Sequence, residues 1–215
     1  MAKHIIEFTK NENVKYVSHL DIVRMFGRAL RRAGITISFS NGFNPHPIMN
    51  FAHPLGVGIS SGCELIEIGV EEDISPENLL VKLSDKMPEG FKLLNAKLAE
   101  EKSPFSRLCF AKYEIELLDN IPTIQPLLDM TEILAEKKTK SGVKETDIRP
   151  LIKSAEVVSN ENGKTVIEAV LKCGEPNLKP ELFIKVLEKI GYSNEYYKIH
   201  RKAILDAEEN PLIKF

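Results

Sequence analysis

Residues 16–56 constrain the fold more than any other stretch, because they combine a helix that has a defined start and end with a rigid loop. Ser18 is a good N-cap, since its hydroxyl can accept a hydrogen bond from a free N–H of the first turn. Asp21, three residues later, suits the positive end of the helix dipole. Gly34 supplies the left-handed residue that ends many helices. The sequence therefore predicts a helix between Ser18 and Gly34.

This predicted helix has two chemically different faces. Apolar side chains recur at three- and four-residue steps, which is the spacing of a buried helix face. They are Leu20, Val23, Phe26, Leu30 and Ala33. Guanidinium groups fall together on the opposite side, at Arg24, Arg28, Arg31 and Arg32. We expect one face to pack on a core and the other to present positive charge, although solvated arginines on an exposed helix need bind nothing.

An extended segment and a stiff loop follow the helix. Residues 35–39 alternate as a half-buried strand does, and residues 41–47 read Asn-Gly-Phe-Asn-Pro-His-Pro. Gly42 permits a positive φ, and the two prolines push the residues before them, Asn44 and His46, into extended conformations. A simple turn does not need this rigidity, so the loop is a candidate site.

The remaining elements of the first half complete a known order. Residues 4–8, 63–71 and 91–99 read as strands, and a helix begins at Ser75 with Pro76 at its first position. The order β-α-β, loop, β-α-β is typical of the ferredoxin-like fold, in which two helices pack on one face of four antiparallel strands.

The second half repeats this order without residue-level similarity. Strands are predicted at residues 108–118, 132–139, 156–158, 165–171 and 196–204, and helices at 122–129 and 180–190. Asn-Glu-Asn-Gly at 160–163 is a hairpin turn, and 137–144 is a basic loop. We therefore expect an α+β protein of tandem ferredoxin-like modules with antiparallel sheets, one at residues 1–102 and the other at 103–215.

Charge is distributed unevenly along a chain whose formal net charge is −2. Residues 1–62 hold seven Lys/Arg and three Asp/Glu (+4), residues 63–102 hold five and ten (−5), and the remainder is −1. Such segregation allows an anion-binding face on an acidic protein. No apolar run approaches about 18 residues and no signal peptide is evident, so we expect a cytoplasmic protein that does not bind membranes.

Three histidines lie within residues 16–56: His19, His46 and His53. With Asp21 they could hold a metal, but their spacing matches no ligand motif, and we expect no metal. Cys63, Cys109 and Cys173 are widely spaced and odd in number, which fits neither disulfides nor an iron–sulfur cluster. Motifs for nucleotide hydrolysis, dinucleotide redox chemistry and serine hydrolysis are absent from the sequence.

RNA or a similar polyanion is the better-supported ligand by residue type. Lys15, Arg24, Arg28, Arg31 and, in the basic loop, Lys140 are candidate phosphate contacts. The polar pocket expected beside them comprises Ser18, Gly42, Phe43 and Asn44, together with His19, Asp21 and His46. No strand carries the aromatic signature of an RNA-recognition sheet, however.

Four separated runs carry a family resemblance: SHLDIVRMFGRALRRAG, FSNGFNPHPIMNFAHPLGVGISS, KTKSGVKETDIRPLI and CGEPNLKPELF. They resemble the radical-SAM-linked domain family of unknown function, which occurs alone or fused to cobalamin-binding radical-SAM enzymes. The resemblance covers nearly the whole chain and implies a radical-SAM enzyme as partner. The CxxxCxxC spacing is missing, so the chain is expected to carry no iron–sulfur cluster and no other cofactor.

Three function classes remain open. The first is an accessory protein that binds RNA for a radical-SAM modifying enzyme. The second is an enzyme, a metal-independent endoribonuclease or other RNA-processing enzyme that uses His19 and His46 with Asp21 as catalytic groups. The third is a protein–protein adaptor whose arginines meet an acidic partner.

Overall fold

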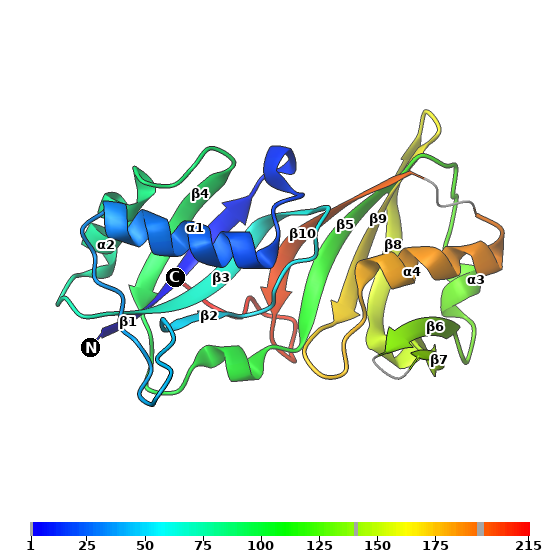
Figure 1. Ribbon diagram of the computed structural model, residues 1–215. Coiled ribbons are helices and arrows are strands. Elements are labelled where there is room, and N and C mark those ends of the chain that lie inside the picture. The colour runs from blue at the N-terminus through cyan, green and yellow to red at the C-terminus, as the bar shows by residue number, and fades with distance from the viewer. Residues whose placement is uncertain (1, 140–141, 193–195) are drawn as a thin grey trace. The chain divides into compact units, whose positions relative to one another are not determined.

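The computed structural model describes residues 2–139, 142–192 and 196–215, and the chain divides into two compact units (Figure 1). Unit 1 comprises Met1–Leu108 and Asn210–Phe215, and unit 2 comprises Cys109–Glu209. Residues 210–215, which the sequence assigned to the second module, therefore belong to unit 1.

Unit 1 is an antiparallel sheet with two helices. Its elements are β1 (Ala2–Lys10), α1 (His19–Arg32), β2 (Met49–Phe51), β3 (Ile59–Val70), α2 (Pro76–Ser84) and β4 (Phe91–Leu98), with short 3-10 turns at Glu12–Val14 and Pro104–Arg107. The strand order is β4-β1-β3-β2, and each neighbouring pair is antiparallel.

Both helices of unit 1 share one core with the sheet. Ile6 and Phe8 alternate along β1 toward the helices, where they meet Phe26 of α1 and Leu79 of α2 in one buried cluster. The rings of Phe8 and Phe26 lie edge to face with centroids 5.0 Å apart. α1 and α2 therefore cover the same face of the sheet.

The opposite face of this sheet is buried as well. Ile5 and Leu65, which alternation directs away from the helices, are almost fully buried. Leu212 and Ile213 in the C-terminal segment are also buried, and Lys97 on β4 donates to the backbone oxygen of Lys214 (3.2 Å).

Two expectations for unit 1 are wrong. Leu20 was expected in the core, but its side chain is 64% exposed, and Ile22 and Ala29 are buried instead. Residues 35–39 form no regular strand and make isolated bridges, Ile37 with Val70 and Phe39 with Pro47. Next to these bridges, the edge of β3 is occupied by β2, which follows the loop at 41–47.

Unit 2 is also built on antiparallel strands. Its elements are β5 (Phe110–Leu117), α3 (Gln125–Leu128), β6 (Leu134–Thr139), β7 (Gly142–Asp147), β8 (Ile152–Glu161), β9 (Lys164–Lys172), α4 (Pro180–Val186) and β10 (Tyr197–Leu205), with 3-10 turns at Arg149–Leu151 and Leu187–Ile190. The strand order is β10-β5-β9-β8, and β6 and β7 pair separately. Residues 137–139 and 142–144 of the expected basic loop thus belong to the paired strands β6 and β7.

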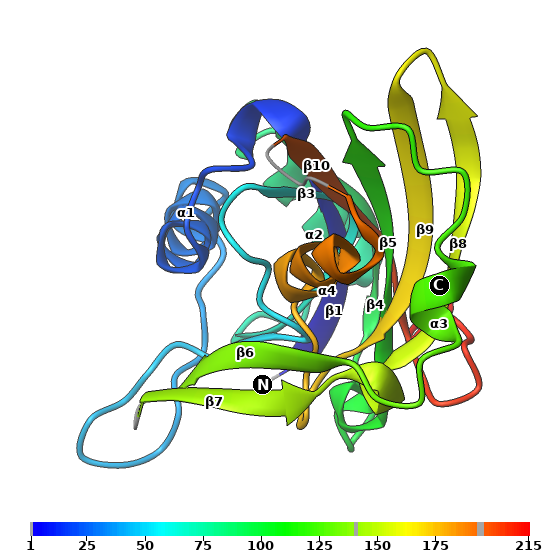
Figure 2. The same cartoon turned by 90° about the vertical axis from the view of Figure 1, so that its right-hand side faces the viewer.

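The two faces of the unit 2 sheet differ. Figure 2 shows α4 on one side of the strands, and Ile115, Ile167 and Ile199 are buried. Ion pairs cross the strands, such as Lys112 with Glu168.

Both units are α+β with mostly antiparallel sheet, as predicted. Within residues 2–139, 142–192 and 196–215, no helix is long and apolar enough to cross a membrane.

Candidate functional site

The start of α1 brings together three of the predicted site residues. The Ser18 hydroxyl accepts a hydrogen bond from the Asp21 N–H (3.2 Å) and donates to the Asp21 carboxylate (2.7 Å). Arg24 donates to the other carboxylate oxygen (3.0 Å). The hydrogen bond from Ser18, followed by that from Arg24, lowers the pKa of Asp21. Asp21 is therefore a hydrogen-bonded carboxylate at neutral pH.

Arg24, Arg28 and Arg31 form one exposed row along α1, which we call the arginine face. Their spacing of four and three residues places them on one side of the helix. In the part of the chain that the structure describes, Arg24 pairs with Asp21, whereas no carboxylate pairs with Arg28 or Arg31. Arg32 lies outside this row, since it donates to the backbone oxygen of Lys86 (2.6 Å).

Exposed apolar side chains lie before, on and after α1. Tyr16 is 72% exposed just before α1, and Phe39 is 50% exposed after it. Leu20 stands four residues before Arg24, on the same side of the helix. Lys15 bonds to Glu12, which raises the pKa of the lysine, and its ammonium lies 5.3 Å from the Tyr16 ring centroid. The predicted phosphate contact Lys15 is thus already engaged by a carboxylate.

His19 packs against the aromatic core at the N-terminus of α1. Its ring lies edge-on to Phe51, with centroids 4.8 Å apart. Phe51 in turn contacts the rings of Phe8 and Phe26. Half-burial of the imidazole lowers the pKa of His19. His19 is therefore a neutral, packed side chain at neutral pH.

The loop at 41–47 is exposed throughout, including Gly42, Phe43 and Asn44. It is closed at its base, where the Ser40 N–H donates to the His46 backbone oxygen (2.8 Å) and the His46 N–H donates to the Ser40 hydroxyl (3.0 Å). Across the described residues, no hydrogen bond or ring contact joins the His46 side chain to His19 or the arginine face. The loop residues and the α1 residues are thus two separate groups.

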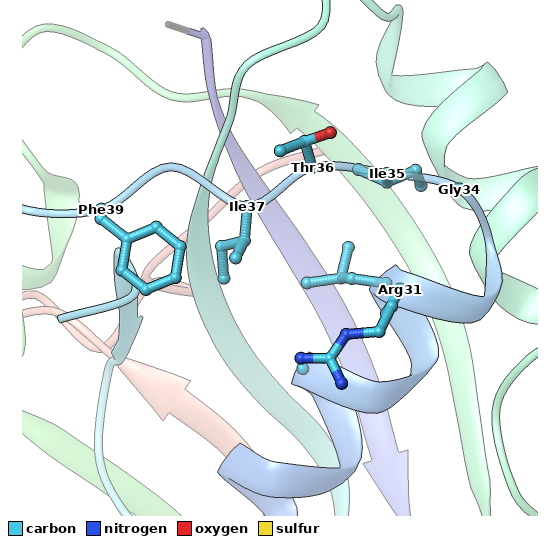
Figure 3. Close-up of a pocket in the computed structure, with 8 residues that line it drawn as sticks. Arg31, Gly34, Ile35, Thr36, Ile37 and Phe39 are labelled. Carbon is cyan, nitrogen blue, oxygen red and sulfur yellow. The ribbon is translucent and has the colours of Figure 1, made fainter.

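A pocket of about 400 Å³ lies at the C-terminal half of α1. It is lined by Gly27, Leu30, Arg31, Gly34, Ile35, Thr36, Ile37 and Phe39. Figure 3 shows the side chains of Ile37 and Phe39 extending to the same side as the Arg31 guanidinium. Sequence reasoning missed Gly27 and Phe39 as site residues. One available signal was the glycine inside a helix, four residues before an arginine.

Other candidate groups lie elsewhere. Lys140 lies outside the described residues. Burial raises the pKa of the Cys173 thiol to about 12, so this cysteine is no thiolate nucleophile. Over the described ranges, no group of three or more His, Cys, Asp or Glu side chains is placed to hold a metal ion.

Fold and site together define an α+β protein with antiparallel sheets and a cationic helix face. The chain belongs to the bacterial family described as "Uncharacterized protein conserved in bacteria (DUF2344)", whose model matches residues 3–180. Among solved structures it is similar to an unknown protein from Galdieria sulphuraria, with 12% identity over 93% of this chain and 96% of that chain and a TM-score of 0.29. No curated protein matches the chain.

Proposed function

We propose that unit 1 binds single-stranded RNA on the outer side of α1. The observation that carries this proposal is the arginine face, an exposed row of three guanidinium groups. Planar guanidinium groups match the geometry of phosphate oxygens. A single anion would need one or two arginines, whereas a row suits a polymer of phosphates.

Exposed aromatic side chains just before and after α1 support a single strand as the ligand. Tyr16 is 72% exposed and Phe39 is 50% exposed, although burial of aromatic rings is favourable. Unpaired bases stack on such rings, and proteins that bind single strands combine stacking with a cationic groove. A duplex would hide the base faces that these rings can contact.

We also propose that both units are ferredoxin-like modules. Counting the four main strands of each unit in chain order, each set is arranged fourth-first-third-second. A helix separates the first strand from the second and the third from the fourth, with the β6–β7 hairpin added in unit 2. In unit 1, residues of the helix-free face such as Ile5 and Leu65 are buried, so this face is not available to RNA. The proposed RNA surface is therefore on the helix side.

The proposed role is accessory: the protein presents RNA to a radical-SAM modifying enzyme in the cytoplasm. The resemblance of residues 18–34 and 39–61 to the radical-SAM-linked family supports this partner. In this proposal the enzyme supplies the iron–sulfur cluster. Capture of the tagged protein from native cells, with and without nuclease, tests the partner. A radical-SAM enzyme among the captured proteins supports it, and its consistent absence contradicts it.

RNA binding is tested by fluorescence anisotropy with a mixed-sequence single strand of about 12 nucleotides, within the usual site sizes. We expect Arg24→Ala/Arg28→Ala/Arg31→Ala to weaken binding. We expect the slope of log K against log salt to fall by about 2, since each contact with a single-strand phosphate contributes about 0.7. The matched control removes three positive charges elsewhere in unit 1, as Lys82→Ala/Lys92→Ala/Lys102→Ala, at exposed positions.

Equal affinity and an equal salt slope in the arginine variant would contradict the proposal, as would absence of RNA binding by the wild type. The same mixtures, run on a denaturing gel with chelator, address catalysis. Discrete cleavage that His46→Ala abolishes would make the protein a metal-independent ribonuclease instead. Capture of an acidic protein that survives nuclease, without RNA binding, would favour the adaptor.

A further inference from the structure

The pocket beside Arg31 combines apolar walls with a cation at its rim. Leu30 and Ile35 are buried, Ile37 is half-buried and Phe39 is half-exposed, whereas the Arg31 guanidinium is exposed (Figure 3). A volume of about 400 Å³ lies within the range of small-ligand sites. The pocket therefore offers a ring-sized apolar space next to a positive charge.

Gly27 keeps this space open at a cost to the helix. A glycine inside a helix destabilises it by about 0.5–1 kcal/mol relative to alanine. A Cβ at Gly27 would lie 3.7 Å from the Met49 methyl carbon, which is an ordinary contact. Packing therefore does not require glycine here. A large side chain at this position would take up part of the pocket, so a small residue here leaves room for a ligand.

The backbone N–H of Thr36, a residue that lines the pocket, is already engaged by a carboxylate. Glu72 accepts hydrogen bonds from the Thr36 N–H (2.8 and 3.1 Å), and Thr36 lowers the pKa of this carboxyl. The Thr36 N–H is thus not available to a ligand, and Arg31 is the one charged residue among those that line the pocket. A ligand with one planar apolar part and one anionic part would therefore place its anionic part on Arg31 and its apolar part against the apolar walls.

We propose that the pocket receives one nucleotide of the bound strand, with its base against Phe39 and its phosphate on Arg31. This inference rests on the proposed function, because Arg24 and Arg28 then continue along α1 as contacts for neighbouring phosphates. The base enters the apolar space that Gly27 leaves open. The base of this nucleotide is thereby turned away from the neighbouring bases. The nucleotide is held by stacking of its base on Phe39 and by contact of its phosphate with Arg31.

The test uses the full chain and single-stranded RNAs that carry the fluorescent base 2-aminopurine at successive positions. Stacking of one base on Phe39 should change its fluorescence on binding, and Phe39→Ala should abolish that change. We expect Phe39→Ala to lower RNA affinity about tenfold, as is typical for loss of one stacked base. Phe215→Ala, which removes another half-exposed ring of unit 1, is the matched control and should bind as the wild type does.

A second pair of variants tests the space itself. Gly27→Leu should fill the pocket and reproduce the loss seen with Phe39→Ala, whereas Gly27→Ala should retain binding. Thermal unfolding monitors the fold of each variant. If RNA binding depends on Arg24 and Arg28 but is unchanged in Phe39→Ala and Gly27→Leu, the pocket proposal is overturned and the proposed function survives.

Failure of the proposed function gives a different pattern. If the wild type binds no RNA, titration with adenosine monophosphate followed by NMR decides the fate of the pocket. Shifts of the Gly34, Thr36 and Phe39 amides that vanish in Gly27→Leu would support a mononucleotide site. Absence of such shifts would overturn the pocket proposal as well.

Discussion

At the scale of single residues, the environment of His19 favours packing over phosphate binding. Its imidazole lies edge-on to Phe51 at the rim of the cluster that contains Phe8 and Phe26. Burial lowers the pKa of His19, so the ring is uncharged at neutral pH. In contrast to the guanidinium groups of α1, it adds no charge to the proposed RNA surface.

The depressed pKa of His19 predicts a pH dependence of stability. The unfolded chain takes up a proton near the ordinary pKa of 6.5, and the folded protein does so only at lower pH. The stabilisation from the neutral ring is therefore present above pH 6.5 and lost as pH falls through the folded-state pKa. We expect urea unfolding to show this loss and NMR titration to place the His19 pKa below 6.5.

His19→Phe is the control for this prediction, because it retains an aromatic ring that cannot be protonated. The loss of stability below pH 6.5 should be smaller in this variant. The prediction would be contradicted if His19→Phe had the same dependence of stability on pH as the wild type, or if the pKa of the His19 ring lay above 6.5.

Helical periodicity predicted part of the candidate site. The exposed row of Arg24, Arg28 and Arg31 follows from their spacing alone. Leu20 was assigned to the core because it is apolar, although it lies four residues from Arg24 and thus on the same side of α1. Phe39 could not be assigned to a pocket, because the pocket arises where residues 34–39 return along α1, and local sequence does not encode that return.

At the scale of elements, α1 depends on a cap that the sequence identified. The Ser18 hydroxyl satisfies the Asp21 N–H in the first turn. We expect Ser18→Ala to lower the free energy of unfolding of unit 1 by about 1 kcal/mol, as is typical for loss of an N-cap. Chemical denaturation with circular dichroism measures the change, and Ser18→Thr, which retains an oxygen acceptor, should lose less. Equal stability of Ser18→Ala and the wild type would show that the cap contributes little.

Local signals located some elements and failed for others. The N-cap, the left-handed Gly34 (φ 68°) and the turn at Asn162 and Gly163 (φ 56° and 71°) lie as predicted, because each depends on a few neighbouring residues. The expected strand at 35–39 is wrong, since β2 pairs with that edge of β3 instead. Alternation of apolar and polar residues predicts an extended backbone. It does not determine which of two extended segments pairs with a strand that is distant in the sequence.

At the scale of the whole molecule, unit 1 depends on the last residues of the chain. Leu212 and Ile213 are 3% and 8% exposed, and burial of such side chains contributes about 1.5–3 kcal/mol each. We expect Leu212→Ala/Ile213→Ala to destabilise unit 1 by about 3 kcal/mol or more. Hydrogen exchange should show faster opening of β1, β3 and β4.

The matched control for this prediction is Lys214→Ala/Phe215→Ala, which changes two exposed neighbours and keeps the Lys214 backbone acceptor for Lys97. It should leave exchange in unit 1 unchanged. Equal exchange rates in both double variants would indicate that residues 210–215 contribute little to unit 1.

Because Met1–Leu108 and Asn210–Phe215 form one unit, Cys109–Glu209 is an insertion within it. A mechanical load applied to the two ends of this chain would therefore pass through unit 1 alone while unit 1 stays folded. The inserted unit would be shielded from tension and would begin to extend only after the C-terminal segment detached. In a single-molecule force experiment, we expect unit 1 to unfold before unit 2 in every extension.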